Sequence, residues 1–222
     1  MNKSAQKSLL AYNCNAQSLC ETYNKMATED VLPGIRSILP ARPDGRTPYD
    51  AIDLGCGSGR DAFWLADQGF QVVGVDASIE MLRHAWDKKT NLSYTTYIED
   101  QLPALARVKQ RGEGYNFFLM SAVWMHLNSA ERKKMIKTMN ELAREGATAY
   151  ISLRQGPSPA DRPMFETPVE EVQDLVAGVK GRTIILPQKP DEQGRQGVSW
   201  DYVGVQFSSG RKARFVPHPA FD

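Results

Sequence analysis

Cysteine and histidine are scarce in this chain of 222 residues, which has three of each. The cysteines, Cys14, Cys20 and Cys56, are an odd number and lack the spacing of a metal site. We therefore predict no metal ion. Because the first residues are also polar, without the apolar core of a signal peptide, the cysteine usage indicates a reducing cytoplasm.

Long apolar runs and an excess of charge of one sign are also missing. No stretch approaches the length that crosses a bilayer. With 27 basic and 26 acidic side chains the net charge is +1, so no overall field favours nucleic acid or an anionic membrane. The composition predicts a cytoplasmic protein, a monomer or homodimer, that binds neither. Its length fits one α/β domain with a sizeable core.

A glycine-rich turn follows the first apolar run, in the order Ala51-Ile-Asp-Leu-Gly-Cys-Gly-Ser-Gly-Arg-Asp-Ala62. Glycine tolerates positive φ and lets backbone approach a ligand closely. The helix expected next begins with unpaired N–H groups that favour polar or anionic groups. We therefore expect a ligand at the carboxyl end of the first strand. A tight turn without a ligand is the simpler alternative. A dinucleotide site is disfavoured, because Arg60 stands where G-x-G-x-x-G/A needs a small residue.

The stretch Asp53-Leu-Gly-Cys-Gly-Ser-Gly59 is similar to the first motif, D/E-x-G-x-G-x-G, of class I S-adenosylmethionine (AdoMet) methyltransferases. A second strand over 70–76 ends in Asp76, whose carboxylate can accept hydrogen bonds from both ribose hydroxyls. A helix then opens, with Ser78 as its expected N-cap. Residues 49–86 thus resemble the nucleoside-binding half of that family, which implies AdoMet as the cofactor and S-adenosylhomocysteine as its product.

The cofactor contacts expected from this resemblance and from the turn are Tyr12, Tyr23, Asp53, Gly55, Cys56, Gly57, Gly59, Arg60, Asp76, Ala77, Met81, Asp100, Gln101, Leu102, Ser121 and Ala122. Several have structural alternatives. The two tyrosines face the cofactor or pack a helix on the domain edge. Arg60 holds the methionine carboxylate or forms a surface salt bridge. Asp100 receives the adenine amine or caps a helix.

The rest of the chain predicts an α/β fold with a doubly wound, mostly parallel seven-stranded sheet and a C-terminal antiparallel hairpin. We expect a single domain over 1–222, with a helical lid (1–40), a core (49–207) and a tail (208–222). Strands after the second are expected at 91–98, 115–120, 147–153, 182–186 and 198–207. Helices are expected at 4–28, 29–39, 60–68, 79–88, 129–144 (capped by Ser129 and stopped by Gly146) and 168–177, with loops at 40–48 and 157–167.

Candidate catalytic residues are His126 and Arg154, which follow the fourth and fifth predicted strands. His126 acts as a general base, or it only caps the following helix or packs against neighbouring residues. Arg154 holds an acidic substrate by a bidentate contact or pairs with an acid such as Asp161. Further substrate contacts are expected at Trp124, Arg195, Ser199 and Trp200, although both tryptophans could instead be core residues.

A bacterial branch of these methyltransferases has segments similar to residues 121–127, 151–157 and 194–200. This resemblance implies the cofactor and the reaction class but does not identify the methyl acceptor. The sequence therefore predicts a cytoplasmic AdoMet-dependent methyltransferase acting on a small molecule. The alternatives are a non-catalytic AdoMet-binding regulatory module and a methyltransferase acting on protein or nucleic acid. A nicotinamide dehydrogenase is disfavoured by Arg60.

Overall fold

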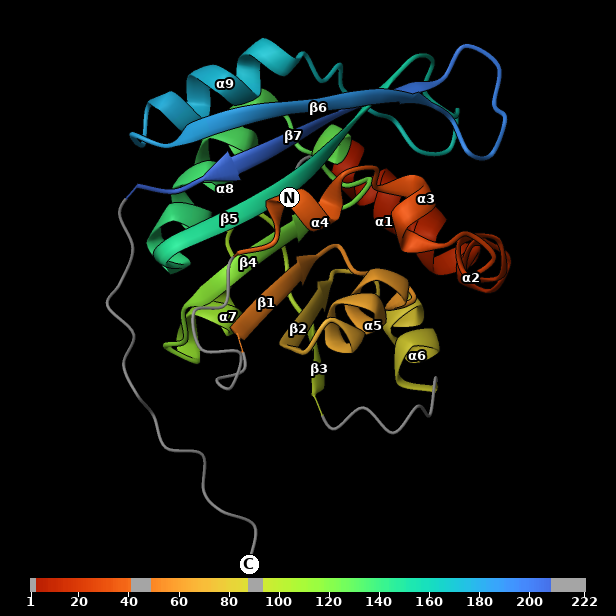
Figure 1. Ribbon diagram of the computed structural model, residues 1–222. Helices are drawn as coiled ribbons and strands as arrows, with labels where there is room; N and C mark the ends of the chain where they lie inside the picture. Colours follow the sequence, from red (N-terminus) through yellow and green to blue (C-terminus); the bar gives the residue numbers. More distant parts are fainter. Residues whose placement is uncertain (1–2, 41–48, 88–93, 209–222) are drawn as a thin grey trace, which may run out of the picture.

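A seven-stranded sheet runs through the centre of the molecule (Figure 1). The computed structural model describes residues 3–40, 49–87 and 94–208. In the order β3-β2-β1-β4-β5-β7-β6, strands β1 to β5 run parallel and β7 is antiparallel to β5 and β6. This confirms the predicted fold class. The strands are β1 (Tyr49–Leu54), β2 (Phe70–Asp76), β3 (Thr95–Glu99), β4 (Tyr115–Met120), β5 (Ala143–Gln155), β6 (Arg182–Pro190) and β7 (Ser199–Gln206).

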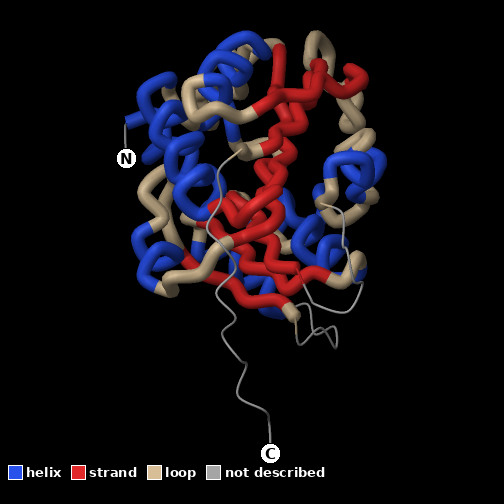
Figure 2. Tube along the Cα trace, turned by 60° about the vertical axis from the view of Figure 1, so that its left-hand side comes forward, coloured by secondary structure: helices blue, strands red, loops and turns tan. Residues whose placement is uncertain are grey.

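Helices cover both faces of the sheet, as the tube in Figure 2 makes visible. They are α1 (Lys3–Cys14), α2 (Ala16–Tyr23), α3 (Thr28–Val31), α4 (Ile35–Ile38), α5 (Arg60–Asp67), α6 (Ile79–Asp87), α7 (Ala106–Gln110), the 3₁₀ turn η1 (Trp124–His126), α8 (Ser129–Leu142) and α9 (Val169–Ala177). Among the described helices, none combines the length and apolar character needed to cross a bilayer.

The side chains of the central strands alternate between two hydrophobic cores. Phe118 and Met120 of β4 pack in the core that includes α7, α8 and α9. Phe117 and Leu119 point the other way, into the core that includes α4 and α5. Because successive side chains of a strand point to opposite faces, a strand buried on both faces reads as a continuous apolar run. The pattern Tyr-Asn-Phe-Phe-Leu-Met of β4 therefore follows from its central position.

The N-terminal helices are more broken than the sequence indicated. The expected helix over 4–28 is interrupted at Asn15, and the expected helix over 29–39 is split into α3 and α4. Leu32 leaves the helical region, with φ −127° and ψ 69°, because the following Pro33 disfavours helical backbone before it. Gly34 then adopts φ +73° at the start of α4. The boundaries were thus wrong, and a lid role for 1–40 stays a prediction.

The junction between α8 and β5 also differs from the prediction. Asn128, not Ser129, caps α8: its side chain accepts from the Glu131 N–H, and the Glu131 carboxylate accepts from the Asn128 N–H. The helix ends at Leu142 rather than at Gly146, and the chain enters β5 directly. The early part of β5 pairs irregularly with β4, which accommodates Gly146 at φ +73°.

The remaining expectations agree with the structure to within a few residues, and Ser78 accepts the Met81 N–H as the predicted cap of α6. The exceptions are β6, which continues to Pro190, and α7, which the sequence did not predict. Residue 88 of the expected second crossover helix, residues 91–93 of the expected third strand, the loop at 41–48 and the tail from 209 lie outside the described residues.

Candidate functional site

The carboxyl ends of the parallel strands open into a cavity of about 250 Å³. In Figure 1 the red helices α1 and α2 lie at the end of the sheet toward which β1 and β4 point. An open parallel sheet usually binds ligands at this place. The predicted site residues that line the cavity are Tyr12, Tyr23, Gly55, Cys56, Gly57, Arg60, Asp76, Ala77, Met81, Asp100, Gln101, Leu102, Ser121, Ala122, His126, Arg154, Arg195 and Trp200.

The glycine turn has the backbone geometry that its sequence predicts. Gly55, Gly57 and Gly59 all adopt positive φ, at +79°, +53° and +76°. A Cβ on Gly55 would lie 2.3 Å from Cγ2 of Val123, so this position also needs the missing side chain. Gly59 lies outside the cavity lining, where a Cβ would meet the Tyr97 hydroxyl at 2.4 Å. Gly59 therefore supports the conformation of the turn without lining the cavity.

Asp76 ties the glycine turn to the end of β2. One carboxylate oxygen accepts from the Gly57 N–H at 2.9 Å, and the other accepts from the Ser78 N–H at 2.8 Å. Burial raises the pKa of Asp76, and these backbone hydrogen bonds oppose that shift. A carboxylate has about four acceptor positions, so Asp76 can accept further hydrogen bonds from a ligand in the cavity.

Asp53 lies beneath the turn rather than in the cavity. It is 1% exposed, and neither carboxylate oxygen has a close hydrogen-bond partner among the described residues. Burial and the nearby Asp61 raise the pKa of Asp53 well above its usual range, while Arg60 and the Ala62 N–H oppose the shift. The structure therefore places Asp53 behind the turn, away from direct ligand contact.

Arg60 lines the cavity but already has a partner. Its guanidinium forms two 2.7 Å hydrogen bonds to the Asp61 carboxylate, which also accepts from the Thr28 hydroxyl at 2.7 Å. The Arg60 and Asp61 side chains are only 17% and 8% exposed. The predicted alternative of a salt bridge is thus present, although it is buried rather than on the surface.

The Asp100 carboxylate caps a helix. It accepts from the Gln101 N–H at 2.8 Å, the Arg107 N–H at 2.8 Å and the Val108 N–H at 3.0 Å, the last two in the first turns of α7. The helix-cap alternative is therefore realised here. Because Asp100 also lines the cavity beside Gln101 and Leu102, contact with an adenine stays a prediction.

Two substrate-contact predictions disagree with the structure. Trp124 is completely buried in the core beneath α8, because η1 turns its side chain inward, so it cannot stack on a ligand. Ser199 begins β7, where it pairs with Gln155 and Pro190 outside the cavity lining. Trp200 does line the cavity, and its indole N–H donates to Asp191 at 2.9 Å.

The N-terminal helices and the loop over 156–168 meet above the cavity. Tyr12 of α1 contacts His126, with 3.1 Å between the hydroxyl oxygen and Nε2. From the loop, the Arg162 guanidinium lies 5.5 Å from the centre of the Tyr12 ring and donates to the Tyr23 hydroxyl at 3.4 Å. Both tyrosines thus face the cavity. The sequence predicted a loop at 157–167 but did not identify Arg162 as a lining residue, since nothing in its local pattern marks it.

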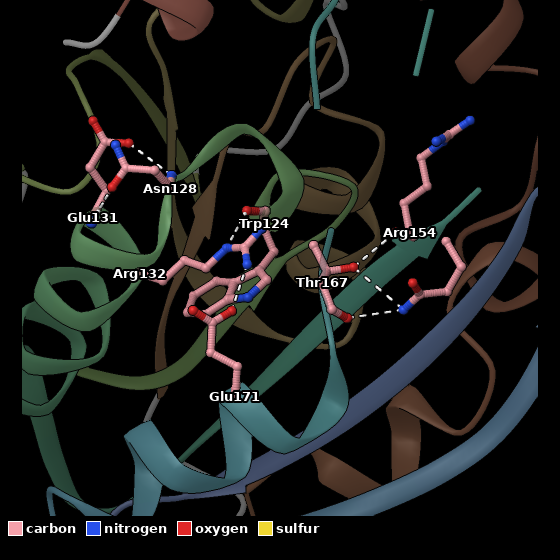
Figure 3. Close-up of polar contacts among 8 residues, drawn as sticks. Trp124, Asn128, Glu131, Arg132, Arg154, Thr167 and Glu171 are labelled. Atoms are coloured by element: carbon pink, nitrogen blue, oxygen red, sulfur yellow. Dashed lines mark hydrogen bonds and ion pairs between the residues drawn. The ribbon is translucent and has the colours of Figure 1, made fainter. Parts of the chain in front are cut away.

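The end of this loop is fixed to β5 beneath the site (Figure 3). Thr167 is fully buried; its hydroxyl donates to the Arg154 carbonyl at 2.8 Å, and its own carbonyl accepts from the Gln155 side chain at 2.9 Å. These contacts fix the loop end that follows Arg162 and Met164, both of which line the cavity.

His126 is held as a neutral hydrogen-bond acceptor. Burial, then Arg162 and Arg154, lower the pKa of His126 to about 4, while the Pro163 carbonyl acts to raise it. Burial raises the pKa of Tyr12, so this hydroxyl keeps its proton and donates to Nε2. The proton of the neutral imidazole then sits on Nδ1, which is buried without a hydrogen-bond partner among the described residues. In this arrangement His126 orients Tyr12, and its basic lone pair is occupied.

We expect the His126 ring to stay neutral from pH ~8 down to about pH 5. Unfolded histidine binds a proton near pH ~6.5 and the folded ring near pH 4, so lowering the pH through this window destabilises the fold, by up to about 3 kcal/mol. NMR titration of the imidazole carbons tests this, with His126→Gln assigning the signal. A midpoint near pH ~6.5 for His126 would contradict the burial argument.

Arg154 is buried next to the cavity without a carboxylate partner. It is 5% exposed, and it donates to the carbonyls of Gly156 and Pro157 at 3.2 and 2.9 Å. The predicted alternative of pairing with Asp161 is wrong, because Asp161 lies 3.7 Å from Arg162.

Arg195, in contrast to Arg154, has a carboxylate partner, Asp191. Burial raises the pKa of Asp191, but hydrogen bonds from Arg195 and Trp200 outweigh that effect and lower the pKa to about 2.

Similarity in sequence to known proteins extends over about half of this chain or less. Residues 51–146 match a family model described as a methyltransferase domain. Glycine N-methyltransferase of Mus musculus is 26% identical over 118 residues, covering 48% of this chain and 40% of that protein. Probable S-adenosyl-L-methionine-dependent methyltransferase TehB of Haemophilus influenzae is 32% identical over 108 residues, covering 47% and 36%. The chain thus spans about two fifths of the length of these curated relatives.

Two solved structures share the fold over most of both chains. The 1,6-didemethyltoxoflavin-N1-methyltransferase of Burkholderia thailandensis, with 1,6-didemethyltoxoflavin and S-adenosylhomocysteine bound, has a TM-score of 0.66 at 15% identity and covers 92% of this chain and 89% of that one. The magnesium protoporphyrin IX methyltransferase of Synechocystis PCC 6803, with AdoMet bound, has a TM-score of 0.56 at 16% identity, covering 94% and 86%.

Proposed function

We propose that this chain is a class I AdoMet-dependent methyltransferase, that its cavity binds AdoMet and that it methylates a small molecule. The observation that carries the proposal is Asp76. Its carboxylate is fixed at the cavity by the N–H groups of Gly57 and Ser78 and can accept further from ribose hydroxyls.

The residues along the cavity fit the three parts of AdoMet. Asp76 suits the ribose, and the stretch from Asp100 to Leu102 offers an edge for the adenine. Because glycine has no side chain, the backbone of the glycine turn can lie close to the methionine part of AdoMet, near Tyr23. Cys56 keeps its proton, because burial raises the pKa of its thiol, and so contributes shape rather than a nucleophile.

AdoMet supplies an electrophilic methyl group on a sulfonium, and the chain supplies position and exclusion of water. The Tyr12 hydroxyl, oriented by His126, faces the cavity and can hydrogen-bond the acceptor. Since the lone pair of His126 is occupied and its pKa is low, it is a poor base for removing a proton. The acceptor we expect is therefore a group that is already nucleophilic near neutral pH.

A small acceptor is favoured by the enclosure of the site. Helix α1 and the loop over 156–168 cover the cavity, with Lys7 donating to the Ala160 carbonyl at 2.9 Å. The net charge of +1 gives no general attraction for nucleic acid. We also propose a cytoplasmic location, on composition and cysteine usage alone, and a monomeric or homodimeric state.

The rate at which the chain forms S-adenosylhomocysteine from AdoMet tests the proposal. We expect this rate to rise when the small-molecule fraction of a bacterial extract is added as a source of acceptors. Excess S-adenosylhomocysteine should suppress the reaction by competition. Turnover only with the protein or nucleic-acid fraction would overturn the small-molecule acceptor. Binding of the cofactor without turnover in any fraction would favour a regulatory module instead.

A further inference from the structure

Two guanidinium groups line the part of the cavity beyond the cofactor residues, and neither has a buried carboxylate partner among the described residues. Arg154, 5% exposed, forms no ion pair among the described residues, and its Nε has no hydrogen-bond partner there. The acid nearest Arg162 is Asp161, 3.7 Å away and 55% exposed, where solvent weakens the attraction. Arg162 Nε is likewise buried without a hydrogen bond in the described part of the chain.

The acids that line the cavity are already engaged elsewhere. Asp61 pairs with Arg60, and Asp191 pairs with Arg195. Asp76 and Asp100 accept backbone N–H groups, and Glu131 closes the cap of α8, while Glu192 pairs with Lys189. None of them is bonded to Arg154 or Arg162 in the described structure, so this end of the cavity carries net positive charge.

Such an arrangement costs stability unless a ligand completes it. A buried charge that lacks a partner is unfavourable, and both Arg162 and Arg195 repel Arg154. Burial first, and then Arg195 and Arg162, lower the pKa of Arg154, while Asp191 opposes the shift. The two carbonyl contacts of Arg154 leave its Nε free, and a planar guanidinium suits an oxyanion.

We propose that the methyl acceptor carries an oxyanion, either a carboxylate or a phosphate ester, and that Arg154 and Arg162 bind it. This inference rests on the proposed function and names the class of its substrate. The oxyanion anchors the acceptor between the loop over 156–168 and β5, beside the Tyr12 hydroxyl. Arg195 is a weaker anchor, because Asp191 neutralises it.

The carboxylate of AdoMet itself is the competing ligand for these arginines. Arg162 donates to the Tyr23 hydroxyl, and both line the same cavity as the glycine turn. The two assignments differ in what they predict for S-adenosylhomocysteine, which retains that carboxylate. If Arg154 held the cofactor, its removal would weaken S-adenosylhomocysteine binding; if it holds the acceptor, binding is unchanged.

The test is a thermal-shift titration of the chain saturated with S-adenosylhomocysteine. The probes are acetate, benzoate, inorganic phosphate and phenyl phosphate, each at equal ionic strength, with acetamide and benzamide as neutral counterparts. We expect at least one anion to raise the midpoint by about 2–4 °C and its neutral counterpart to have no effect. The carboxylate and phosphate arms identify which oxyanion the site takes.

Arg154→Gln should abolish the anion shift while its affinity for S-adenosylhomocysteine stays within about twofold of the parent chain, which also shows that it folds. Arg144→Gln, whose parent side chain pairs with Asp50, is the matched control and should keep the shift. Equal effects of anions and amides, no anion effect at all, or a tenfold loss of S-adenosylhomocysteine affinity in Arg154→Gln would each overturn the inference. Failure of the parent chain to bind S-adenosylhomocysteine would instead overturn the proposed function.

Discussion

Asp76→Ala is expected to lower the affinity for S-adenosylhomocysteine by about a hundredfold while the chain stays folded. Hydrogen bonds to a charged group contribute roughly 1.5–3 kcal/mol each, and two ribose hydroxyls would lose theirs, which corresponds to about 3 kcal/mol or more. The freed N–H groups of Gly57 and Ser78 lie at the cavity, where water can replace the carboxylate.

Isothermal titration measures this affinity, and a thermal melt of each variant establishes folding. Asp76→Asn keeps one acceptor oxygen and should fall between the parent chain and Asp76→Ala. Asp174→Ala, which removes an exposed acid from α9, is the control for a change of charge and should bind normally. Unchanged affinity per folded molecule in Asp76→Ala would show that this carboxylate only supports the turn.

Glu171→Ala is expected to destabilise the fold by about 3 kcal/mol, because it leaves a buried arginine without its partner. The Arg132 side chain is 3% exposed and lies 2.5 Å from the Glu171 carboxylate (Figure 3). Arg132 also donates to the Trp124 carbonyl at 3.3 Å and lies over the Trp124 ring. The pair therefore joins α8 and α9 to η1, the turn that carries His126.

Thermal unfolding should show a fall in midpoint of about 6–12 °C for Glu171→Ala. Glu113→Ala removes a half-exposed acid that pairs with Arg111 and should cost less than about 1 kcal/mol. Replacing both partners, as Arg132→Met with Glu171→Leu, should recover much of the loss, since apolar groups need no counter-charge. Equal costs for Glu171→Ala and Glu113→Ala would show that burial does not strengthen the pair.

The sheet and the cofactor half of the cavity were predictable because local sequence determines them. A strand buried on both faces must be apolar along its length, as Phe117 to Met120 are. Positive φ at Gly55 and Gly57 and the cap at Ser78 depend on properties of single residues. These features place Asp76 beside the turn without any knowledge of distant contacts.

The predictions that were wrong depend on competition between neighbours or on distant packing. Asn128 and Ser129 are both suitable N-cap residues. Asn128 takes the position because it forms reciprocal hydrogen bonds with Glu131. Trp124 follows a strand end that leads into the site, yet its side chain packs under Arg132, which comes from the next helix. Arg162 lies at the cavity on a loop that distant contacts hold in place, among them the hydrogen bond of Thr167 to β5 and that of Lys7 to Ala160.

Isothermal titration of the unmodified chain with S-adenosylhomocysteine, and separately with NAD, tests the central claim most directly. The account predicts saturable binding of S-adenosylhomocysteine to one site per chain and no heat of binding with NAD. Binding of NAD, or of neither ligand, would contradict the assignment of the glycine turn and Asp76 to an AdoMet site.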